Sequence, residues 1–326
     1  MKAIRIHEYG GPEVLVYEDV AKPEAGEGRV LIRVEAASVN PVDVAVREDR
    51  FPTPKTPPKI LGSDGAGVVE AVGPGVTTVS PGDEVFFSGL GVGSEGSYAE
   101  YAVIAEAQAV AKPPAVSFVE AAAIGMAFPA AYYGLVTRGD VKEGETVLIQ
   151  GGAGGVGSAA IQLAKARGAR VLTTVSGEAA RRLVREVGAD EVVDFAEQDV
   201  AAEIDRLTDG RGPDLIHELV ISENLATDVA MVAKGGRIVC TGQGPRPEAT
   251  VPIGPAIAKD ATLLFMNLNN AGRAGIAAIA AEIGGLAAEG KVRPVVGATL
   301  PLSEARRAHE LLEGDHVGKI VLLPGA

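Results

Sequence analysis

The segment with the clearest chemical meaning is GGAGGVG, residues 151–157, in which five of the seven positions are glycine. Positions without a side chain let the backbone turn tightly and bring amide hydrogens close to a diphosphate at a helix N-terminus. An apolar run at 146–150 precedes the segment, and apolar residues at helical spacing follow it. The pattern predicts a dinucleotide-binding turn formed by Gly152, Ala153, Gly154, Gly155, Val156 and Gly157.

The end of the next strand distinguishes between two dinucleotides. The stretch RVLTTVSGEAARR, residues 170–182, ends its strand in Ser176 and Gly177, where an NAD-selective site usually carries Asp or Glu. A hydroxyl and an amide can donate to a 2′-phosphate, and Arg181 or Arg182 can supply positive charge one turn later. The pattern therefore favours NADPH over NADH. Glu178 opposes this preference, and a solvated helix face is the alternative interpretation of the two arginines.

The elements that must position these residues follow two different patterns. Residues 1–111 form short alternating runs separated by Gly and Pro, which predicts a β-rich lobe. From residue 139, strands alternate with helices at 157–166, 178–187, 199–207 and 224–231, which predicts a doubly wound parallel sheet. A long helix at 273–289, a helix at 303–313 and a last strand at 318–324 follow, and we expect this tail to rejoin the first lobe.

Composition sets limits on partners and compartment. The 326 residues suit two domains, and the net charge of −13 argues against nucleic acid. Cys240 is the single cysteine, so an internal disulfide and a thiolate zinc cluster are excluded, and we expect a cytoplasmic protein. The longest uncharged run, 121–136, is too short for a membrane span and contains Gly and Pro. We interpret it as a buried interdomain helix and expect no membrane partner.

Ten segments, in order, carry a resemblance to a known family. They include AASVNPVDVAVR (36–47), LGSDGAGVVEAVGPGV (61–76), GSYAEYAV (96–103), VLIQGGAGGVG (147–157) and GKIVL (318–322). The chain resembles a medium-chain dehydrogenase/reductase, and within that superfamily the zinc-independent quinone oxidoreductase (zeta-crystallin-like) group. The resemblance implies an α/β protein with a GroES-like catalytic domain (1–123 and 263–326) and a Rossmann domain (124–262).

The metal ligands of the zinc-dependent relatives are replaced in this chain. Where those relatives carry Cys, a His-Glu pair and Cys, the matching positions are Asn40, Ser63-Asp64 and Met126. An amide, a hydroxyl and a thioether do not replace the thiolate and imidazole ligands of catalytic zinc. We therefore expect no metal.

The resemblance implies hydride transfer from NADPH to a quinone, and the alternative is an activated alkene: an alkenal, an enone or a 2-enoate. Asn40 and Asp64 are the candidate catalytic residues. The amide of Asn40 could donate to a substrate carbonyl, although a turn-forming Asn before Pro41 is the other interpretation. A family Tyr position is Ala45 and a family Thr position is Ala130, so a placed proton donor is missing there. A sensor or structural protein that binds NADPH without turnover is the rival from another class.

The same resemblance assigns further residues. Phe195 could face the adenine, Gly242 and Gln243 could line the nicotinamide, and backbone groups around Asn267 and Asn269 could fix its carboxamide. We expect a homodimer or higher homo-oligomer that joins sheets edge to edge near 262–267. Lys319 could reach a phosphate, but we interpret it, like His309, as a surface residue.

Overall fold

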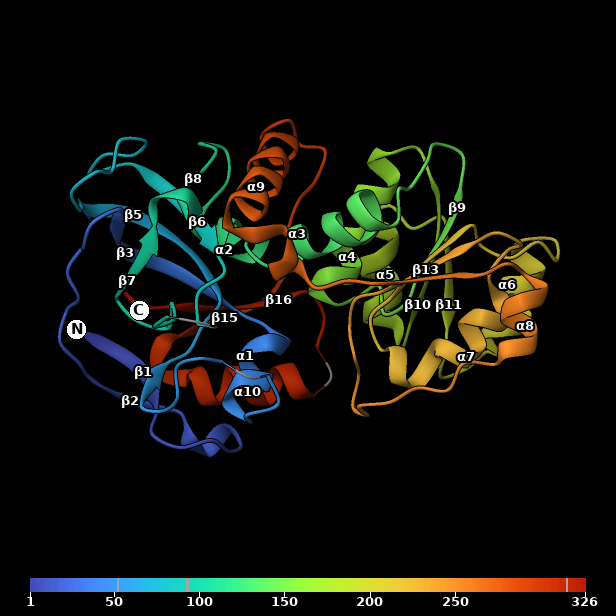
Figure 1. Cartoon of the computed structure of the whole chain (residues 1–326), viewed down its shortest axis with the longest axis horizontal. Coiled ribbons are helices and arrows are strands. Elements are labelled where there is room, and N and C mark those ends of the chain that lie inside the picture. Colours follow the sequence, from blue (N-terminus) through green and yellow to red (C-terminus); the bar gives the residue numbers. More distant parts are fainter. Residues whose placement is uncertain (52, 92–93, 315) are drawn as a thin grey trace. The chain divides into compact units, whose positions relative to one another are not determined.

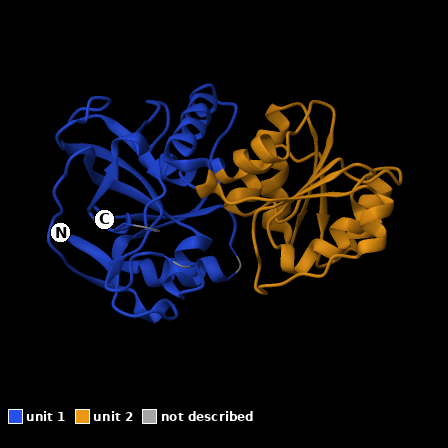
Figure 2. Cartoon of the chain, in the orientation of Figure 1, with its two compact units in different colours: residues 1–129, 271–326 blue, residues 130–270 orange. Residues whose placement is uncertain are grey.

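The computed structural model describes residues 1–51, 53–91, 94–314 and 316–326. The chain divides into two compact units, shown in Figure 2: unit 1 comprises 1–129 and 271–326, and unit 2 comprises 130–270. The domain boundaries predicted from the sequence lie at 123/124 and 262/263. The second of these falls inside β14 (Thr262–Phe265), which pairs with its neighbour β13 (Arg237–Cys240) within unit 2.

Unit 1 contains two sheets, both visible in Figure 1. The smaller sheet has the order β2-β1-β4, and the larger has the order β15-β16-β3-β5-β6-β8, with β7 paired to β3. In the larger sheet β16 runs antiparallel to β3, with Val321 opposite Ser38, so the prediction that the tail rejoins the first lobe is confirmed. The strands are β1 (Lys2–Ile6), β2 (Val16–Asp19), β3 (Arg29–Val39), β4 (Lys59–Ile60), β5 (Asp64–Val72), β6 (Glu84–Ser88), β7 (Tyr101–Ala105), β8 (Val110–Ala111), β15 (Val296–Pro301) and β16 (Lys319–Leu323).

Helices connect these strands, and one of them was not expected. Helix α1 begins directly after β3, with extended Asn40 as its N-cap and Pro41 in the first turn. Its N3 residue, Asp43, accepts a hydrogen bond from the Asn40 amide, which is half of a capping box. The helical segments are η1 (Pro12–Val14), α1 (Pro41–Arg47), η2 (Glu106–Gln108), α2 (Phe118–Ile124), α9 (Gly272–Ala288), η5 (Leu302–Glu304) and α10 (Ala305–Glu313).

The single helix expected over 121–136 is wrong. The chain instead forms α2, then α3 (Ala127–Tyr132), then a π-helical turn at Tyr133–Arg138. A Cβ on Gly125, between α2 and α3, would lie 2.6 Å from the Cβ of Asp64, so only glycine allows this approach. Pro129 has no N–H to continue the hydrogen-bond ladder.

Two helical stretches, 118–138 and 268–288, are long and apolar enough to cross a membrane. The first is 67% buried and the second 22% buried within the described residues. Core helices pass the same test, so this finding is weak evidence for a span.

Unit 2 is a six-stranded, wholly parallel sheet with the order β11-β10-β9-β12-β13-β14. Helices lie on both of its faces in Figure 1, so the predicted doubly wound sheet is confirmed. Its strands are β9 (Thr146–Ile149), β10 (Arg170–Val175), β11 (Glu191–Asp194), β12 (Leu215–Glu218), β13 and β14, and its helices are α4 (Gly155–Ala166), α5 (Glu178–Glu186), α6 (Val200–Leu207), α7 (Ile221–Met231), α8 (Ile253–Ala258) and η4 (Leu268–Ala271).

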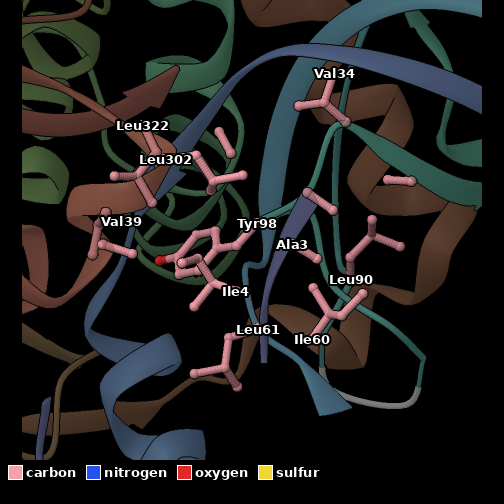
Figure 3. Packing of buried hydrophobic residues seen from close by; sticks show 14 of the residues in the cluster. Ala3, Ile4, Val34, Val39, Ile60, Leu61, Leu90, Tyr98, Leu302 and Leu322 are labelled. Carbon is pink, nitrogen blue, oxygen red and sulfur yellow. The ribbon is translucent and has the colours of Figure 1, made fainter. Parts of the chain in front are cut away.

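Each unit has its own apolar core. In unit 1, Tyr98 lies among aliphatic side chains from several strands, including Ile4 and Val39, as Figure 3 shows. In unit 2, Leu148 and Ile216 from the central strands form the middle of the second core. Central parallel strands are buried on both faces, which explains why their sequences are continuous apolar runs.

Candidate functional site

The glycine turn lies where the strand order of unit 2 reverses. The strands β10 and β11 lie on one side of β9, and β12, β13 and β14 lie on the other. Ligands of open parallel sheets bind outside the carboxyl ends of the strands at such a reversal. The turn leaves the carboxyl end of β9 and leads into α4, as the sequence predicts.

Steric limits show that two glycines of this turn, Gly152 and Gly157, are required. A Cβ on Gly157 would lie 2.2 Å from the carbonyl oxygen of Gly151, and one on Gly152 would lie 2.1 Å from Thr173 Oγ1. Gly151 itself has a φ of +70°, which favours glycine. The first i to i−4 hydrogen bond of α4 runs from Ser158 to Gly154 at 2.9 Å. The earlier amides of the helix, those of Gly155, Val156 and Gly157, therefore precede the helical ladder, which is the donor set that a diphosphate needs.

The residues expected to bind the 2′-phosphate are close together, but the Gly177 amide and the Arg181 guanidinium already donate hydrogen bonds within the protein. Ser176 is exposed after β10, and Gly177 has a φ of +86° as the N-cap of α5. The Gly177 N–H donates to Asp194 Oδ2 at 2.9 Å, and Arg181 Nε donates to the same oxygen at 2.9 Å. The guanidinium of Arg181 also contacts Glu197 Oε2 at 2.6 Å.

These contacts correct the sequence interpretation in one respect. The Gly177 amide, which was expected to donate to a 2′-phosphate, donates to Asp194 instead. This backbone donor, followed by Ala196 N–H and by Arg181, keeps the pKa of Asp194 below its ordinary value. Arg182 projects into solvent with its side chain 79% exposed and lies 3.5 Å from Glu186.

The remaining expected cofactor residues follow the carboxyl ends of β11, β13 and β14, at the same edge of the sheet as the glycine turn. Phe195 is 56% exposed. A Cβ on Gly242 would lie 1.9 Å from the carbonyl oxygen of Leu219, so the backbone passes closely there. The carbonyl of Gln243 accepts from the Ser222 amide at 3.0 Å. The side chain of Asn267 closes its own turn by accepting from the Asn269 amide at 2.9 Å.

A buried polar chain that the sequence did not reveal supports the glycine turn. Thr174 Oγ1 accepts from the Gly151 amide at 3.1 Å and donates to Gln150 Oε1 at 2.7 Å. Gln150 Nε2 donates to Asp228 Oδ1 at 2.8 Å. Burial, followed by the proximity of the Glu218 carboxyl group, raises the pKa of Asp228 well above its ordinary value. The protonated form of Asp228 is therefore favoured.

In unit 1, the candidate Asn40 is the centre of a buried network. Its Nδ2 donates to Asp64 Oδ1 at 3.0 Å and to the Ser38 carbonyl at 3.2 Å. Its Oδ1 accepts from Lys319 Nζ at 2.5 Å, and the same ammonium group donates to the Val39 carbonyl at 2.9 Å. Both amide hydrogens of Asn40 are therefore in use, and a substrate carbonyl can receive one only by replacing an internal bond.

Two carboxylates anchor this network. Asp64 accepts from Ser38 Oγ at 2.7 Å and from the Met126 amide at 2.8 Å. Burial raises the pKa of Asp64, and the charge of Lys319 is the main effect that opposes the rise.

The second carboxylate is Asp43. It accepts from Ser63 Oγ at 2.5 Å, from the Tyr98 hydroxyl at 2.9 Å and from the Asn40 amide at 2.9 Å. Burial raises its pKa to about 6, against the effect of these three donors.

The donor set of this cluster does not suit a divalent cation. Asp64 is surrounded by hydrogen-bond donors, and the neighbouring group from Met126 is its backbone N–H and not its thioether. Over the described ranges of the chain, His, Cys, Asp and Glu side chains form no group of three or more that could hold a metal. The ligand chemistry of zinc sites is therefore not met by the residues at these positions.

Two surface assignments are wrong. Lys319 is only 6% exposed and serves the Asn40 network. His309 is fully buried, with Nδ1 3.0 Å from Arg47 Nη1 and its ring edge-on to Tyr98. A lysine within an otherwise apolar strand such as 319–323 is a signal for a buried, partnered charge, and the N-x-x-D spacing of Asn40 and Asp43 is a signal for the cap.

Comparison with known proteins is consistent with this geometry. The alcohol dehydrogenase GroES-like domain family matches residues 26–114, and the zinc-binding dehydrogenase family matches residues 155–281. The human quinone oxidoreductase is 35% identical over 99% of this chain and 98% of its own length. An Arabidopsis thaliana NADPH-dependent alkenal/one oxidoreductase is 33% identical over 99% of this chain and 80% of its own length.

Solved structures agree over the full length. A mycobacterial protein in complex with NADPH is 34% identical with a TM-score of 0.91, covering 99% of this chain and all of the other. An NAD-dependent alcohol dehydrogenase is 35% identical with a TM-score of 0.92, covering 99% of each chain. The similar structures thus include proteins described with each of the two dinucleotides.

Proposed function

The chain belongs to the quinone oxidoreductase group of the medium-chain dehydrogenases/reductases, and from that membership we propose that it is an NADPH-dependent, zinc-independent reductase of quinones. The observation that carries the proposal is the glycine turn at the strand-order reversal of unit 2, where Gly152 and Gly157 leave no room for a side chain. Such a turn binds the diphosphate of a dinucleotide.

The cofactor fits the residues present. The first amides of α4 would hold the diphosphate, and Ser176 with Arg181 would meet the 2′-phosphate of NADPH. Phe195 would offer its exposed ring to the adenine. When bound, NADPH supplies a hydride; the residues of the chain bind, orient and exclude water.

We assign the contact with the acceptor to Asn40. Its bond to the Ser38 carbonyl, at 3.2 Å, is longer than its bond to Asp64, at 3.0 Å. A quinone oxygen would take the place of the Ser38 carbonyl and would receive the same amide hydrogen as negative charge develops. Lys319 and Asp64 would keep the amide in this orientation.

The reaction balances with one proton from solvent. A quinone that accepts a hydride becomes a hydroquinone monoanion, which takes one proton to complete the two-electron reduction. A quinol oxygen acquires that proton readily in water, so the Ala at position 45 does not prevent turnover. An enone needs a proton at carbon, for which a placed acid is a greater advantage.

An alkenal or enone is the second candidate acceptor, favoured by the similarity to the plant alkenal/one oxidoreductase. We also propose a homodimer formed through β14, an edge strand whose Phe265 is 65% exposed. The expected compartment is the cytoplasm.

The test is a steady-state comparison of 1,4-benzoquinone, 9,10-phenanthrenequinone and 2-alkenals, each with NADPH and with NADH, on chelator-treated protein. We expect the highest kcat/KM for a quinone with NADPH and no loss of activity after chelation. Faster turnover of 2-alkenals would favour the second candidate. Binding of NADPH without oxidation by any acceptor would refute the enzyme assignment.

A further inference from the structure

We propose that Glu197 reduces the preference for NADPH over NADH by competing with the 2′-phosphate for Arg181. The inference rests on the proposed function, because it concerns the adenosine end of the same dinucleotide site. Glu197 and Asp194 both contact Arg181, and neither was identified from the sequence as part of that site.

The contacts place the Arg181 guanidinium beside the expected 2′-phosphate position. Asp194 Oδ2 accepts both from the Gly177 amide and from Arg181 Nε, each at 2.9 Å. Two donors that share one oxygen must lie next to each other, so Arg181 lies at the Ser176-Gly177 turn. This turn follows β10, where the adenosine ribose binds in sheets of this type.

The two carboxylates differ in their surroundings. Asp194 is 2% exposed and is held by the amides of Gly177 and Ala196 as well as by Arg181, so its position is fixed. The side chain of Glu197 is 63% exposed and contacts Arg181 Nη2 at 2.6 Å. Asp194 therefore positions the cation, whereas Glu197 is an exposed anion that an incoming phosphate can displace.

The charge balance explains why this competition weakens the binding of NADPH and not that of NADH. In the free protein, Asp194 and Glu197 give two negative charges against the single charge of Arg181. A 2′-phosphate that binds this guanidinium competes with Glu197 for Nη2 and approaches the negative charge of that carboxylate. NADH carries a hydroxyl at that position and neither gains the contact nor meets the repulsion. Glu197 thus weakens NADPH binding and leaves NADH binding unchanged.

The experiment measures dissociation constants by isothermal titration calorimetry, so no turnover is needed. The ligands are NADPH, NADH and the fragments 2′,5′-ADP and 5′-AMP. At low ionic strength, Glu197→Gln should bind NADPH and 2′,5′-ADP about three- to tenfold more tightly than wild type, with NADH and 5′-AMP unchanged. In about 0.5 M salt the gain should shrink, because the groups are exposed.

Two further variants separate the possible causes. Arg181→Gln should lose NADPH affinity, and the double variant Arg181→Gln/Glu197→Gln should show no gain over it. Glu203→Gln removes an equal charge from another ion pair, with Arg206 at 2.8 Å, and should change neither affinity.

Each outcome decides between the claims. Wild-type protein that binds neither dinucleotide would refute the proposed function itself. Wild-type protein that binds NADPH, with Glu197→Gln equal to it, would overturn the inference alone. Weaker NADPH binding by Glu197→Gln would also overturn it, since Glu197 would then hold Arg181 in place for the phosphate.

Discussion

Replacing Lys319 by Met tests whether the buried network around Asn40 is held by this one cation. Met has nearly the same length and shape but donates no hydrogen bonds. In the variant, the Val39 carbonyl and Asn40 Oδ1 lose the donor that now lies 2.9 and 2.5 Å away. Asp64 also loses the positive charge that opposes the rise in its pKa.

The expected cost follows from these two acceptors. A buried polar group left without its partner costs about 1–3 kcal/mol, and the apolar Met side chain recovers part of the loss. We therefore expect the free energy of unfolding to fall by about 3 kcal/mol. For a unit of this size the midpoint of thermal unfolding should fall by roughly 10 °C.

Urea unfolding followed by circular dichroism measures the change. Lys291→Met is the matched control, because Lys291 has a 58% exposed side chain paired with Glu289 at 2.7 Å, and it should shift stability by no more than about 0.5 kcal/mol. Combining Lys319→Met with Asn40→Leu should cost less than the sum of the single changes, because the orphaned acceptor is removed. A loss below about 1 kcal/mol in folded Lys319→Met would refute the reasoning.

Two other predictions concern the glycine turn and a buried carboxyl. Gly157→Ala should abolish NADPH binding in calorimetry, because the new Cβ would lie 2.2 Å from the Gly151 carbonyl oxygen. The control is Gly285→Ala in α9, where a Cβ would meet no atom within 4 Å. This control should bind NADPH normally and raise the free energy of unfolding by about 0.5–1 kcal/mol. Equal NADPH affinity in both variants would contradict the fit. The folded pKa of Asp43, about 6, exceeds its ordinary value of 3.8. The protonated Asp43 side chain therefore stabilises the folded state fully below pH 4, and this stabilisation is lost as pH rises through 6. The free energy of unfolding should fall by about 3 kcal/mol over this range. Urea unfolding of wild type relative to Asp43→Asn between pH 4 and pH 7.5 should show this decline, and parallel curves would count against it.

The sequence by itself determined the architecture of unit 2 and the position of its dinucleotide turn. Periodicity and glycine spacing are local properties: an apolar strand, a GxGxxG turn and an amphipathic helix are each encoded within a few consecutive residues. The parallel direction of the six strands follows because helical crossovers join consecutive strands. For the same reason the glycines at 152 and 157 could be assigned without coordinates.

Only the tertiary structure decided which polar groups meet. Lys319 reaches Asn40 across 279 positions of the chain, because β16 pairs with β3. Asp194 reaches the Gly177 turn because β11 lies beside β10, and it takes the amide that the sequence assigned to a phosphate. Burial and pairing depend on neighbours that are distant in sequence, so the charge state of a cluster and the free or engaged state of a donor cannot be obtained from local pattern.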